Sequence, residues 1–324
     1  MICLCVVQCY AQMDPLPSWN EGSAKQAIIH FVKITTDRSN KDYVPPNDRL
    51  ATFDQDGTLW VEQPIYAQVM FAFNQVVECA SKHPEWKEKM PFKAVLHDET
   101  TAMGKLNKKD LEEIVFATHV GMTTDEFKNT VRKWLAKAKD CRWKRPYTDL
   151  VYEPMLEVVR YFRNNGYKTY IVTGAGQDFV RAYSAEIYGM PPEQVIGSAV
   201  NTEFNHSQDG TGLLIRLPKL LLNDNFSGKP ENIYLFTGRR PQAAFGNSTG
   251  DRQMLEYTQG GGKSALMMLV LHDDSKREYA YGPANGLPST EVGTFTQELY
   301  DEAKSRGWHI ISIKNDWKQL FQFK

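Results

Sequence analysis

Helical and strand-like segments alternate along the second half of the chain, and this alternation constrains the fold more than any other feature. Short apolar segments typical of buried strands lie at residues 168–172, 195–200, 242–245, 265–271 and 309–313. Segments with helical periodicity lie between them at residues 153–164, 177–188, 251–257 and 295–305. Strands joined through helices pair in parallel and carry those helices on their faces. The alternation therefore predicts an α/β fold, a Rossmann-like three-layer sandwich around a parallel central sheet.

The first half of the chain contains one strand pattern, at residues 49–53, followed by a long helical block at residues 66–139. Within this block we expect helices at 67–81 and 108–120 and a capping box at 123–126. Because the strand precedes the block and the alternation follows it, the pattern predicts a helical domain inserted into the α/β domain. We place the α/β core at residues 13–65 and 150–324, and the inserted all-helical domain at residues 66–149.

One antiparallel element is expected inside the α/β region. Residues 200–204 and 212–217 have strand patterns and flank a turn at Asp209 and Gly210. A short connection of this kind joins antiparallel strands, so the sequence predicts a β-hairpin there.

The overall composition excludes several classes of function. The 324 residues carry a net charge of −1, with 42% hydrophobic and 24% charged residues. Such a balance offers no basic field for nucleic acid, so we expect no nucleic-acid partner. No apolar stretch approaches the ~20 residues that a membrane-spanning helix needs, so we expect no stable membrane insertion.

The first 12 residues differ from the rest of the chain. They combine a short apolar block with small residues before a cut after Ala11, a pattern that resembles the end of a secretory signal peptide. We expect an exported protein, periplasmic or secreted, if residues 1–12 are such a remnant, and a cytoplasmic protein otherwise. Cleavage would leave Cys79 and Cys141, for which a disulfide bridge and two free thiols are both open.

Two carboxylates follow the first strand. Asp54 and Asp56 lie two residues apart behind Leu50-Ala51-Thr52-Phe53, and Gly57 and Thr58 come next. Side chains alternate along an extended backbone, so both acids share one face at the end of the strand. This arrangement can supply a nucleophile, a proton donor and ligands for a divalent cation, although a surface turn is the simpler interpretation of the motif taken alone.

Other polar residues follow later strands or a loop and can meet these acids, because the carboxyl ends of parallel strands share one edge of the sheet. Thr173 and Gly174 close one strand and can form an anion site, and Lys229 is a cation on a loop framed by glycine and proline. Asn247 and Asp251 follow another strand and offer oxygen ligands for a hard cation. Each has a structural alternative: a helix cap for Thr173 and Asp251, and an exposed lysine for Lys229.

Three further segments are weaker candidates. Residues 260–264 resemble the end of a phosphate-binding loop, but Tyr257 stands where that loop needs a glycine. The run 272–274 (His-Asp-Asp) suggests a metal pair without a third ligand nearby, and Arg239-Arg240 suggests either an anion contact or a solvated loop. We expect none of them to be part of the site.

The motifs around Asp54, Thr173, Lys229 and Asp251 together resemble those of the haloacid dehalogenase-like (HAD) hydrolase superfamily. Residues 54–58 match its Asp-x-Asp-Gly-Thr motif, and residues 246–251 match its acidic fourth motif except that Asn247 replaces an aspartate. The resemblance covers about residues 45–65 and 150–260. The helical insertion resembles the cap of the phosphoserine-phosphatase-like branch.

This resemblance implies a Mg²⁺-dependent phosphatase that hydrolyses phosphate monoesters of small molecules through an aspartyl-phosphate. It implies Asp54 as nucleophile, Asp56 as general acid and base, and Thr173, Gly174 and Lys229 as phosphate-binding residues. The metal ligands would come from Asp54, Asp56, Asn247 and Asp251, with the direct ligand among the last two left open. Residues 60, 62, 63 and 66 (Trp, Glu, Gln, Tyr) would line the substrate pocket.

Other functions remain open at this stage. A phosphomutase shares all four motifs but must protect its phosphoenzyme from water. A carbon–halogen hydrolase needs no proton for its leaving group and usually lacks the second aspartate, so Asp56 counts against it. A secreted binding protein on an inactive hydrolase scaffold is a third alternative, and the intact motif residues disfavour it.

Overall fold

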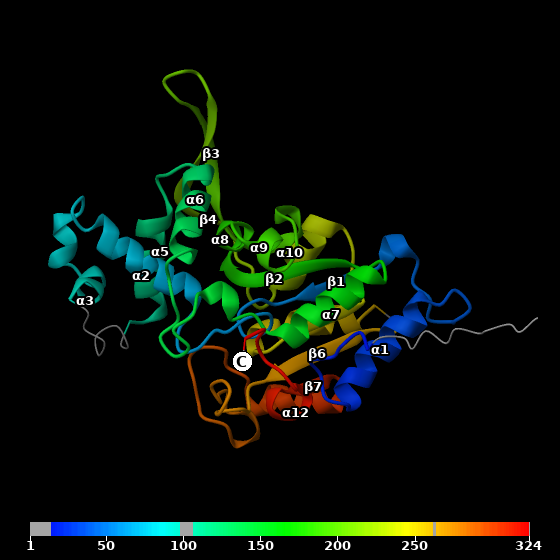
Figure 1. Cartoon of the computed structure of the whole chain (residues 1–324). Coiled ribbons are helices and arrows are strands. Elements are labelled where there is room, and N and C mark those ends of the chain that lie inside the picture. Colours follow the sequence, from blue (N-terminus) through cyan, green and yellow to red (C-terminus); the bar gives the residue numbers. More distant parts are fainter. Residues whose placement is uncertain (1–13, 98–105, 262–263, 324) are drawn as a thin grey trace, which may run out of the picture.

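A seven-stranded sheet with the order β4-β3-β2-β1-β5-β6-β7 forms the centre of the molecule (Figure 1). The computed structural model describes residues 14–97, 106–261 and 264–323. The strands are β1 Leu50–Phe53, β2 Lys168–Gly176, β3 Val195–His206, β4 Gly212–Leu222, β5 Ala243–Gly246, β6 Leu266–Leu271 and β7 His309–Ser312. Only the β3–β4 pair of this sheet is antiparallel. The predicted α/β fold with a mainly parallel sheet is confirmed.

Helices cover both faces of the sheet. Outside residues 66–149, the described helices are α1 Ser23–Thr36, α7 Glu153–Asn164, α8 Gln177–Arg181, α9 Ser184–Ile187, α10 Gly228–Thr237, α11 Arg252–Gln259, α12 Gln297–Ser305 and α13 Ile313–Asp316. Alternate residues of β5 belong to different clusters: Ala243 and Phe245 pack in the cluster that includes α1 and α7, whereas Ala244 packs with α11 and α12. This period of two creates two cores, one on each face of the sheet.

The stretch between β1 and β2 is helical, as predicted. It contains α2 Ala67–Cys79, α3 Phe92–Leu96, α5 Lys108–His119 and α6 Thr124–Leu135, which lie to one side of the sheet in Figure 1. Phe73, Trp86, Phe92 and Ile114 belong to a separate apolar cluster of these helices. The boundaries of this insertion at residues 66 and 149 stay predictions.

The described residues also contain short 3₁₀ turns. They are Pro46–Asp48, Pro84–Lys87, Tyr147–Asp149, Pro192–Gln194, Thr249–Asp251 and Ala284–Gly286.

The predicted hairpin is longer than expected and reaches the helical insertion. Its strands extend to His206 and Leu222, and the backbone of Arg216 on β4 exchanges hydrogen bonds with the α5–α6 connection. Arg216 N–H donates to Met122 O at 3.0 Å, and Gly121 N–H donates to Arg216 O at 2.9 Å. Two segments far apart in the sequence therefore lie side by side over one end of the sheet.

The prediction of one helix at residues 177–188 is wrong, because the structure has two helices there, α8 and α9. The carbonyl oxygen of Ala182, at the break, accepts a hydrogen bond from Arg132 Nε of helix α6 at 2.8 Å. Tyr183 leaves the helical conformation, and its ring stacks on Trp60 with centroids 5.1 Å apart. These tertiary contacts replace the helical hydrogen bonds that local periodicity predicts.

Several expectations concern the chain ends and the cysteines. The signal-peptide expectation for residues 1–12, with its consequence for export, lies outside the described residues, as do residues 262 and 263 of the glycine-rich segment.

Cys79 is half-buried, Cys141 is exposed, and both are free thiols, so the disulfide alternative is not observed. Within the described ranges no helix is both long and apolar enough to cross a bilayer.

The predicted capping box of α6 is present, and its contribution can be measured. Thr123 Oγ1 accepts a hydrogen bond from Glu126 N–H at 3.1 Å, and Glu126 Oε2 accepts one from Thr123 N–H at 2.8 Å. Because Thr123→Ala leaves a helix-terminal N–H without its partner, we expect the free energy of unfolding to fall by about 1 kcal/mol in urea titrations. Thr130→Ala in the middle of α6 is the control, and an equal loss there would contradict the cap assignment.

His119 at the end of α5 couples stability to pH. Its ring is buried between Phe71 and Phe127, with centroids 5.0 and 5.1 Å away. Burial, together with the nearby Arg216 guanidinium, lowers the pKa of His119 from 6.5 to about 3. The folded protein therefore keeps this imidazole neutral at pH values at which the unfolded chain binds a proton.

We expect His119 to make the protein less stable as the pH falls from 6.5 toward 3. In that window the unfolded state binds one more proton than the folded state, which lowers the free energy of unfolding by up to about 1.4 kcal/mol per pH unit. His119→Phe keeps an aromatic ring without the titration, so its stability should depend less steeply on pH in urea titrations. Parallel pH profiles for the two proteins would refute this assignment.

Candidate functional site

The site begins where β1 ends. Asp54 N–H donates to Phe245 O at 2.8 Å, which continues the pairing of β1 with β5, and the chain then turns at Gly57 with φ +73°. A Cβ on Gly57 would lie 2.1 Å from Asn247 Nδ2 and 2.3 Å from Glu62 Oε1. Only glycine fits this turn, because it tolerates the positive φ and leaves room for both side chains.

The Lys229 ammonium contacts three other parts of the chain close to this turn. Its Nζ donates to Asp54 Oδ1 at 2.8 Å, to Asp251 Oδ1 at 2.5 Å and to Val172 O of β2 at 3.0 Å. The side chain is only 2% exposed. The exposed-lysine alternative is therefore wrong, and so is the loop assignment, because Lys229 lies in the first turn of α10.

Asp251 is fully buried and held from two sides. Its Oδ1 accepts from Lys229, and its Oδ2 accepts from the backbone N–H groups of Asn247 and Ser248, both at 3.0 Å. Asp251 occupies the N-cap position of α11, as the helix-cap alternative expects, but its carboxylate makes no cap hydrogen bond to that helix and instead completes the capping box of the 3₁₀ turn Thr249–Asp251. Asp251 thus compensates the charge of Lys229 and orders the turn after β5.

Asn247 lies between Thr58 and Glu62. Its Oδ1 accepts from Thr58 Oγ1 at 3.2 Å, and its Nδ2 donates to Glu62 Oε1 at 2.6 Å. The same Glu62 oxygen accepts from Tyr281 OH at 2.8 Å, and burial raises the pKa of Glu62 to about 8. Sequence reasoning expected Glu62 in the pocket but missed its contact with Asn247 and the part of Tyr281.

The segment after β6 contacts the turn that follows β1. His272 Nε2 donates to Gly57 O at 2.8 Å, and His272 Nδ1 contacts Glu278 Oε2 at 2.8 Å. Asp273 instead accepts from Ser312 Oγ, and Asp274 accepts from Arg277. The residues of the His-Asp-Asp run thus have separate partners, and they form no metal pair.

Asp54 and Asp56 have unusual protonation equilibria. Burial and the neighbouring Asp251 raise the pKa of Asp54, and the Lys229 ammonium opposes this rise. Burial raises the pKa of Asp56 to about 6, although Trp60 Nε1 donates to its Oδ1 at 2.6 Å. A carboxyl group with a pKa near 6 can both give and accept a proton close to neutral pH.

Thr173 is buried at the end of β2, and its Oγ1 accepts from Ala175 N–H at 3.1 Å. The residue that precedes α8 is Gly176, so Thr173 is not the cap of that helix. Thr173 and Gly174 line a cavity of about 610 Å³ together with Asp54, Asp56 and Lys229. The structure therefore brings Thr173, Gly174 and Lys229 to the same hollow as the two acids of β1.

The walls of this cavity come from the helical insertion and the hairpin. Glu62, Tyr66 and Gln68 line it near α2, whereas Gln63 bonds to Thr290 and Val292. Its apolar lining consists of Val69, Leu111, Val115, Phe116, Ala175, Ala199, Val200 and Leu220. The cavity is thus polar at its floor, whereas apolar side chains alternate with Gln68, Glu112, His119 and Arg216 where it meets α2, α5 and the hairpin.

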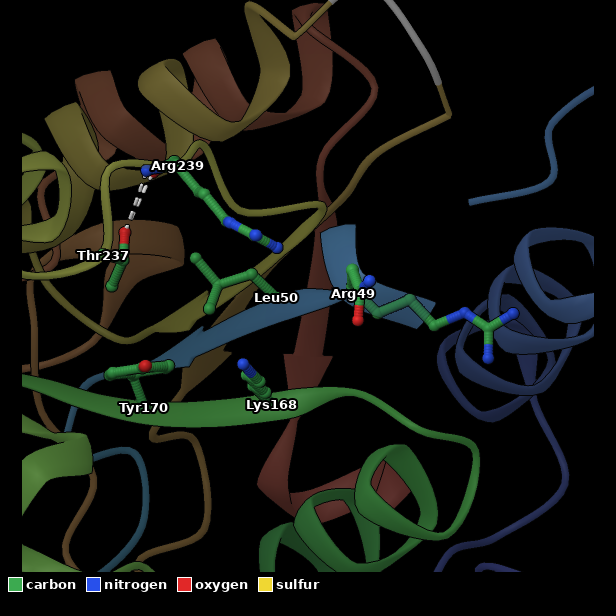
Figure 2. Close-up of a pocket in the computed structure, with 7 residues that line it drawn as sticks. Arg49, Leu50, Lys168, Tyr170, Thr237 and Arg239 are labelled. Carbon is green, nitrogen blue, oxygen red and sulfur yellow. Dashed lines mark hydrogen bonds between the residues drawn. The ribbon is translucent and has the colours of Figure 1, made fainter. Parts of the chain in front are cut away.

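A second, smaller hollow lies at the opposite ends of the strands. Figure 2 shows Arg49, Leu50, Lys168, Tyr170 and Arg239 around it, where β1 and β2 begin. Arg49 is committed to Val44 O and Asn165 O, and Arg239 Nη1 lies 3.5 Å from Asp48. Arg239 is exposed, in agreement with the solvated-loop interpretation, and it lines this hollow rather than the cavity beside Asp54 and Asp56. Arg240 is half-buried and contacts the carbonyl oxygen and the ring of Tyr257.

The oxygen atoms of Asp54 and Asn247 are suitable ligands for a hard cation. Asp54 Oδ2 has no hydrogen-bond partner among the described residues, and Asn247 Oδ1 faces only the Thr58 hydroxyl. Mg²⁺ needs only one or two carboxylates besides neutral oxygens and water. In the described parts of the chain, no cluster of three or more His, Cys, Asp or Glu side chains is placed to hold a metal.

Comparisons with solved structures support the fold. A protein of unknown function from Anaerococcus prevotii DSM 20548 matches with 16% identity and a TM-score of 0.55, over 81% of this chain and 89% of that one. A protein from Bordetella pertussis Tohama I has 17% identity and a TM-score of 0.47, over 82% and 98%. A phosphoserine phosphohydrolase-like protein from Francisella tularensis has 17% identity and a TM-score of 0.37, over 69% and 88%. The last two are too distant to support an argument.

Comparisons at the level of sequence identify the family. A search of curated proteins finds no match. The family model described as haloacid dehalogenase-like hydrolase matches residues 51–256, which include most of β1, the two acids that follow it, the helical insertion, Lys229 and Asp251. The chain belongs to the haloacid dehalogenase-like hydrolase family.

Proposed function

We propose that this hydrolase is a Mg²⁺-dependent phosphatase that cleaves phosphate monoesters of small molecules through an aspartyl-phosphate. The observation that carries the proposal is the buried Lys229 ammonium, which contacts Asp54 and Asp251 at the floor of the cavity that Thr173 also lines. Phosphoryl transfer depends mainly on positioning and on charge neutralisation. A cation, a hydroxyl group and two acids around one hollow offer both.

Asp54 is the proposed nucleophile. Its carboxylate attacks phosphorus, the bond to the leaving oxygen breaks, and an acyl phosphate forms, which water then hydrolyses. Asp56 is the proposed general acid and base: it protonates the leaving oxygen and then takes a proton from the attacking water. Its contact with Trp60 Nε1 positions the carboxyl group, and its pKa of about 6 suits both roles.

Thr173, Gly174 and Lys229 are proposed to bind the phosphate oxygens. The Thr173 hydroxyl and the backbone at Gly174 line the cavity beside the acids, and Lys229 is fixed by its three hydrogen bonds. All three N–H groups of Lys229 are donated to protein oxygens in this structure, so we propose that it acts on the phosphate through its fixed positive charge, which needs no reorganisation during the reaction. Bound Mg²⁺ would neutralise the negative charge of phosphate and of Asp54.

The proposed cation ligands are the Asp54 carboxylate, the Asp56 backbone carbonyl and the Asn247 amide oxygen. Asp251 is the fourth candidate, but Lys229 and two backbone N–H groups already hold its oxygens. The structure thus favours Asn247 over Asp251 as a direct ligand. In this arrangement Asp251 acts through Lys229, and Glu62 fixes the Asn247 amide so that its oxygen faces away from Glu62.

The alternatives are less well supported. A carbon–halogen hydrolase needs no proton donor for its leaving group, whereas Asp56 is buried beside Asp54 with a raised pKa. A phosphomutase remains an alternative that a mutase assay separates from a phosphatase. A binding protein without catalysis would not need the Lys229 ammonium buried against two carboxylates, because such burial has an electrostatic cost.

Asp54→Asn tests the nucleophile. With p-nitrophenyl phosphate we expect Mg²⁺-dependent release of p-nitrophenol from the unaltered protein and no detectable turnover from the variant, because an amide cannot form the acyl phosphate. Asp48→Asn, which changes an exposed acid ahead of β1, is the matched control and should retain activity. Turnover by a correctly folded Asp54→Asn protein would exclude this assignment, and inactivity of the unaltered protein with Mg²⁺ would favour the binding-protein alternative.

Asp56→Asn tests the general acid through the leaving group. For an alkyl phosphate, whose alkoxide needs a proton, we expect kcat/KM to fall by about 10²–10⁴-fold. For p-nitrophenyl phosphate the fall should be much smaller, because p-nitrophenolate leaves without a proton. Equal losses for the two esters would argue that Asp56 acts only in binding or in structure.

A further inference from the structure

We propose that the ester cleaved in this cavity carries a largely apolar organic group, without a second negative charge, that extends from the phosphate to helix α5. This inference rests on the proposed phosphatase function and adds the class of substrate. The observation behind it is the lining of the 610 Å³ cavity away from Asp54 and Asp56. Residues of α2, α5, β3 and β4 form the walls there, and we call this region the upper part of the cavity.

Apolar side chains line this upper part on two sides, among polar residues such as Gln68, Glu112 and Arg216. On α5, Leu111, Val115 and Phe116 line the cavity, and Leu111 and Val115 are four positions apart on one face. Glu112 and His119 of the same helix line it as well. The three apolar residues are half-buried, so part of their apolar surface is left uncovered by the protein. Val200 and Leu220 of the hairpin line the cavity as well, and Leu220 is 50% exposed. An apolar ligand would cover this surface, which is favourable in water.

The size of the cavity fits an organic molecule rather than phosphate alone. Ligand sites for organic molecules commonly measure about 300–1,000 Å³ and bury most of the ligand surface. The cavity of about 610 Å³ lies in this range, and it extends from Asp54 and Lys229 to α5. A phosphate ester of a very small alcohol would leave the apolar walls uncovered.

The charges of the lining disfavour a second anionic group on the substrate. Lys229 and Arg216 are the only lysine or arginine among the described lining residues, and both are already paired. Arg216 Nη1 contacts the Asp178 carboxylate, Arg216 Nε donates to His119 O at 2.7 Å, and the guanidinium lies 4.0 Å from the centre of the Phe127 ring. Because Asp178 already neutralises the Arg216 guanidinium, a carboxylate on the substrate would gain little from binding there.

The experiment compares kcat/KM for three esters with Mg²⁺: ethyl phosphate, hexyl phosphate, and hexyl phosphate bearing a terminal carboxylate. We expect kcat/KM to rise by about fourfold for each methylene that the cavity fully buries, so burial of two of the four added methylenes raises it by about tenfold from ethyl to hexyl. The terminal carboxylate should lower it again by tenfold or more. p-Nitrophenyl phosphate serves as the reference for catalysis itself.

Two variants locate the effect. Val115→Asn on α5 should remove most of the preference for hexyl over ethyl phosphate while leaving kcat/KM for ethyl phosphate nearly unchanged. Val77→Asn, an exposed position on α2 outside the cavity lining, is the matched control and should keep the preference. If Val115→Asn does not fold, Leu220→Asn on β4 tests the opposite wall.

The outcomes separate this inference from the function on which it rests. No Mg²⁺-dependent turnover of p-nitrophenyl or alkyl phosphates would overturn both. Turnover with equal kcat/KM for ethyl and hexyl phosphate, or with a preference for the carboxylate-bearing ester, would overturn the substrate class alone. A preference for hexyl phosphate that survives both Val115→Asn and Leu220→Asn would also overturn it.

Discussion

The arrangement of the site depends on one buried ammonium group. Lys229 Nζ contacts Asp54 after β1, Val172 O in β2 and Asp251 ahead of α11, so one side chain from α10 joins three other parts of the chain. Burial disfavours the charged ammonium, but the two carboxylates outweigh this and raise the pKa of Lys229. Breaking a buried pair of this kind commonly costs about 3–5 kcal/mol, because it leaves an uncompensated charge in the interior. The same interaction that stabilises the fold thus positions the groups that are proposed to bind phosphate.

A second buried network sets the turn that carries the two acids. Glu62 accepts hydrogen bonds from Asn247 and Tyr281, and His272 bonds the carbonyl oxygen of Gly57. Burial lowers the pKa of His272, but the Glu278 carboxylate outweighs this effect and raises the pKa. A protonated ring agrees with the contacts of both ring nitrogens with oxygen acceptors. Buried polar groups need partners, so this network specifies one conformation of the turn. The residues after β6 therefore act on the site without lining its floor.

The cavity above the acids is formed by segments that are remote in sequence. Helices α2 and α5 precede β2, whereas the hairpin β3–β4 follows it, and the two groups meet through the backbone contacts of Arg216 with the α5–α6 connection. Neither group alone encloses the site. The helical insertion by itself was expected to act as a cap, and the hairpin supplies a second wall that the sequence pattern predicted only as a short, local element.

The sequence by itself determined the alternation of helices and strands, the carboxylates behind β1 and the capping box of α6, because each depends on neighbouring residues. It also indicated which residues the sheet collects at one edge, although their roles stay proposals. Only the tertiary structure decided that Lys229 is helical and buried, that the helix after β2 breaks at Tyr183, and that Asn247 turns its nitrogen to Glu62. The physical reason is that these features depend on contacts between residues far apart in the chain, such as Glu62 and Asn247, which are 185 positions apart, and local periodicity carries no information about them.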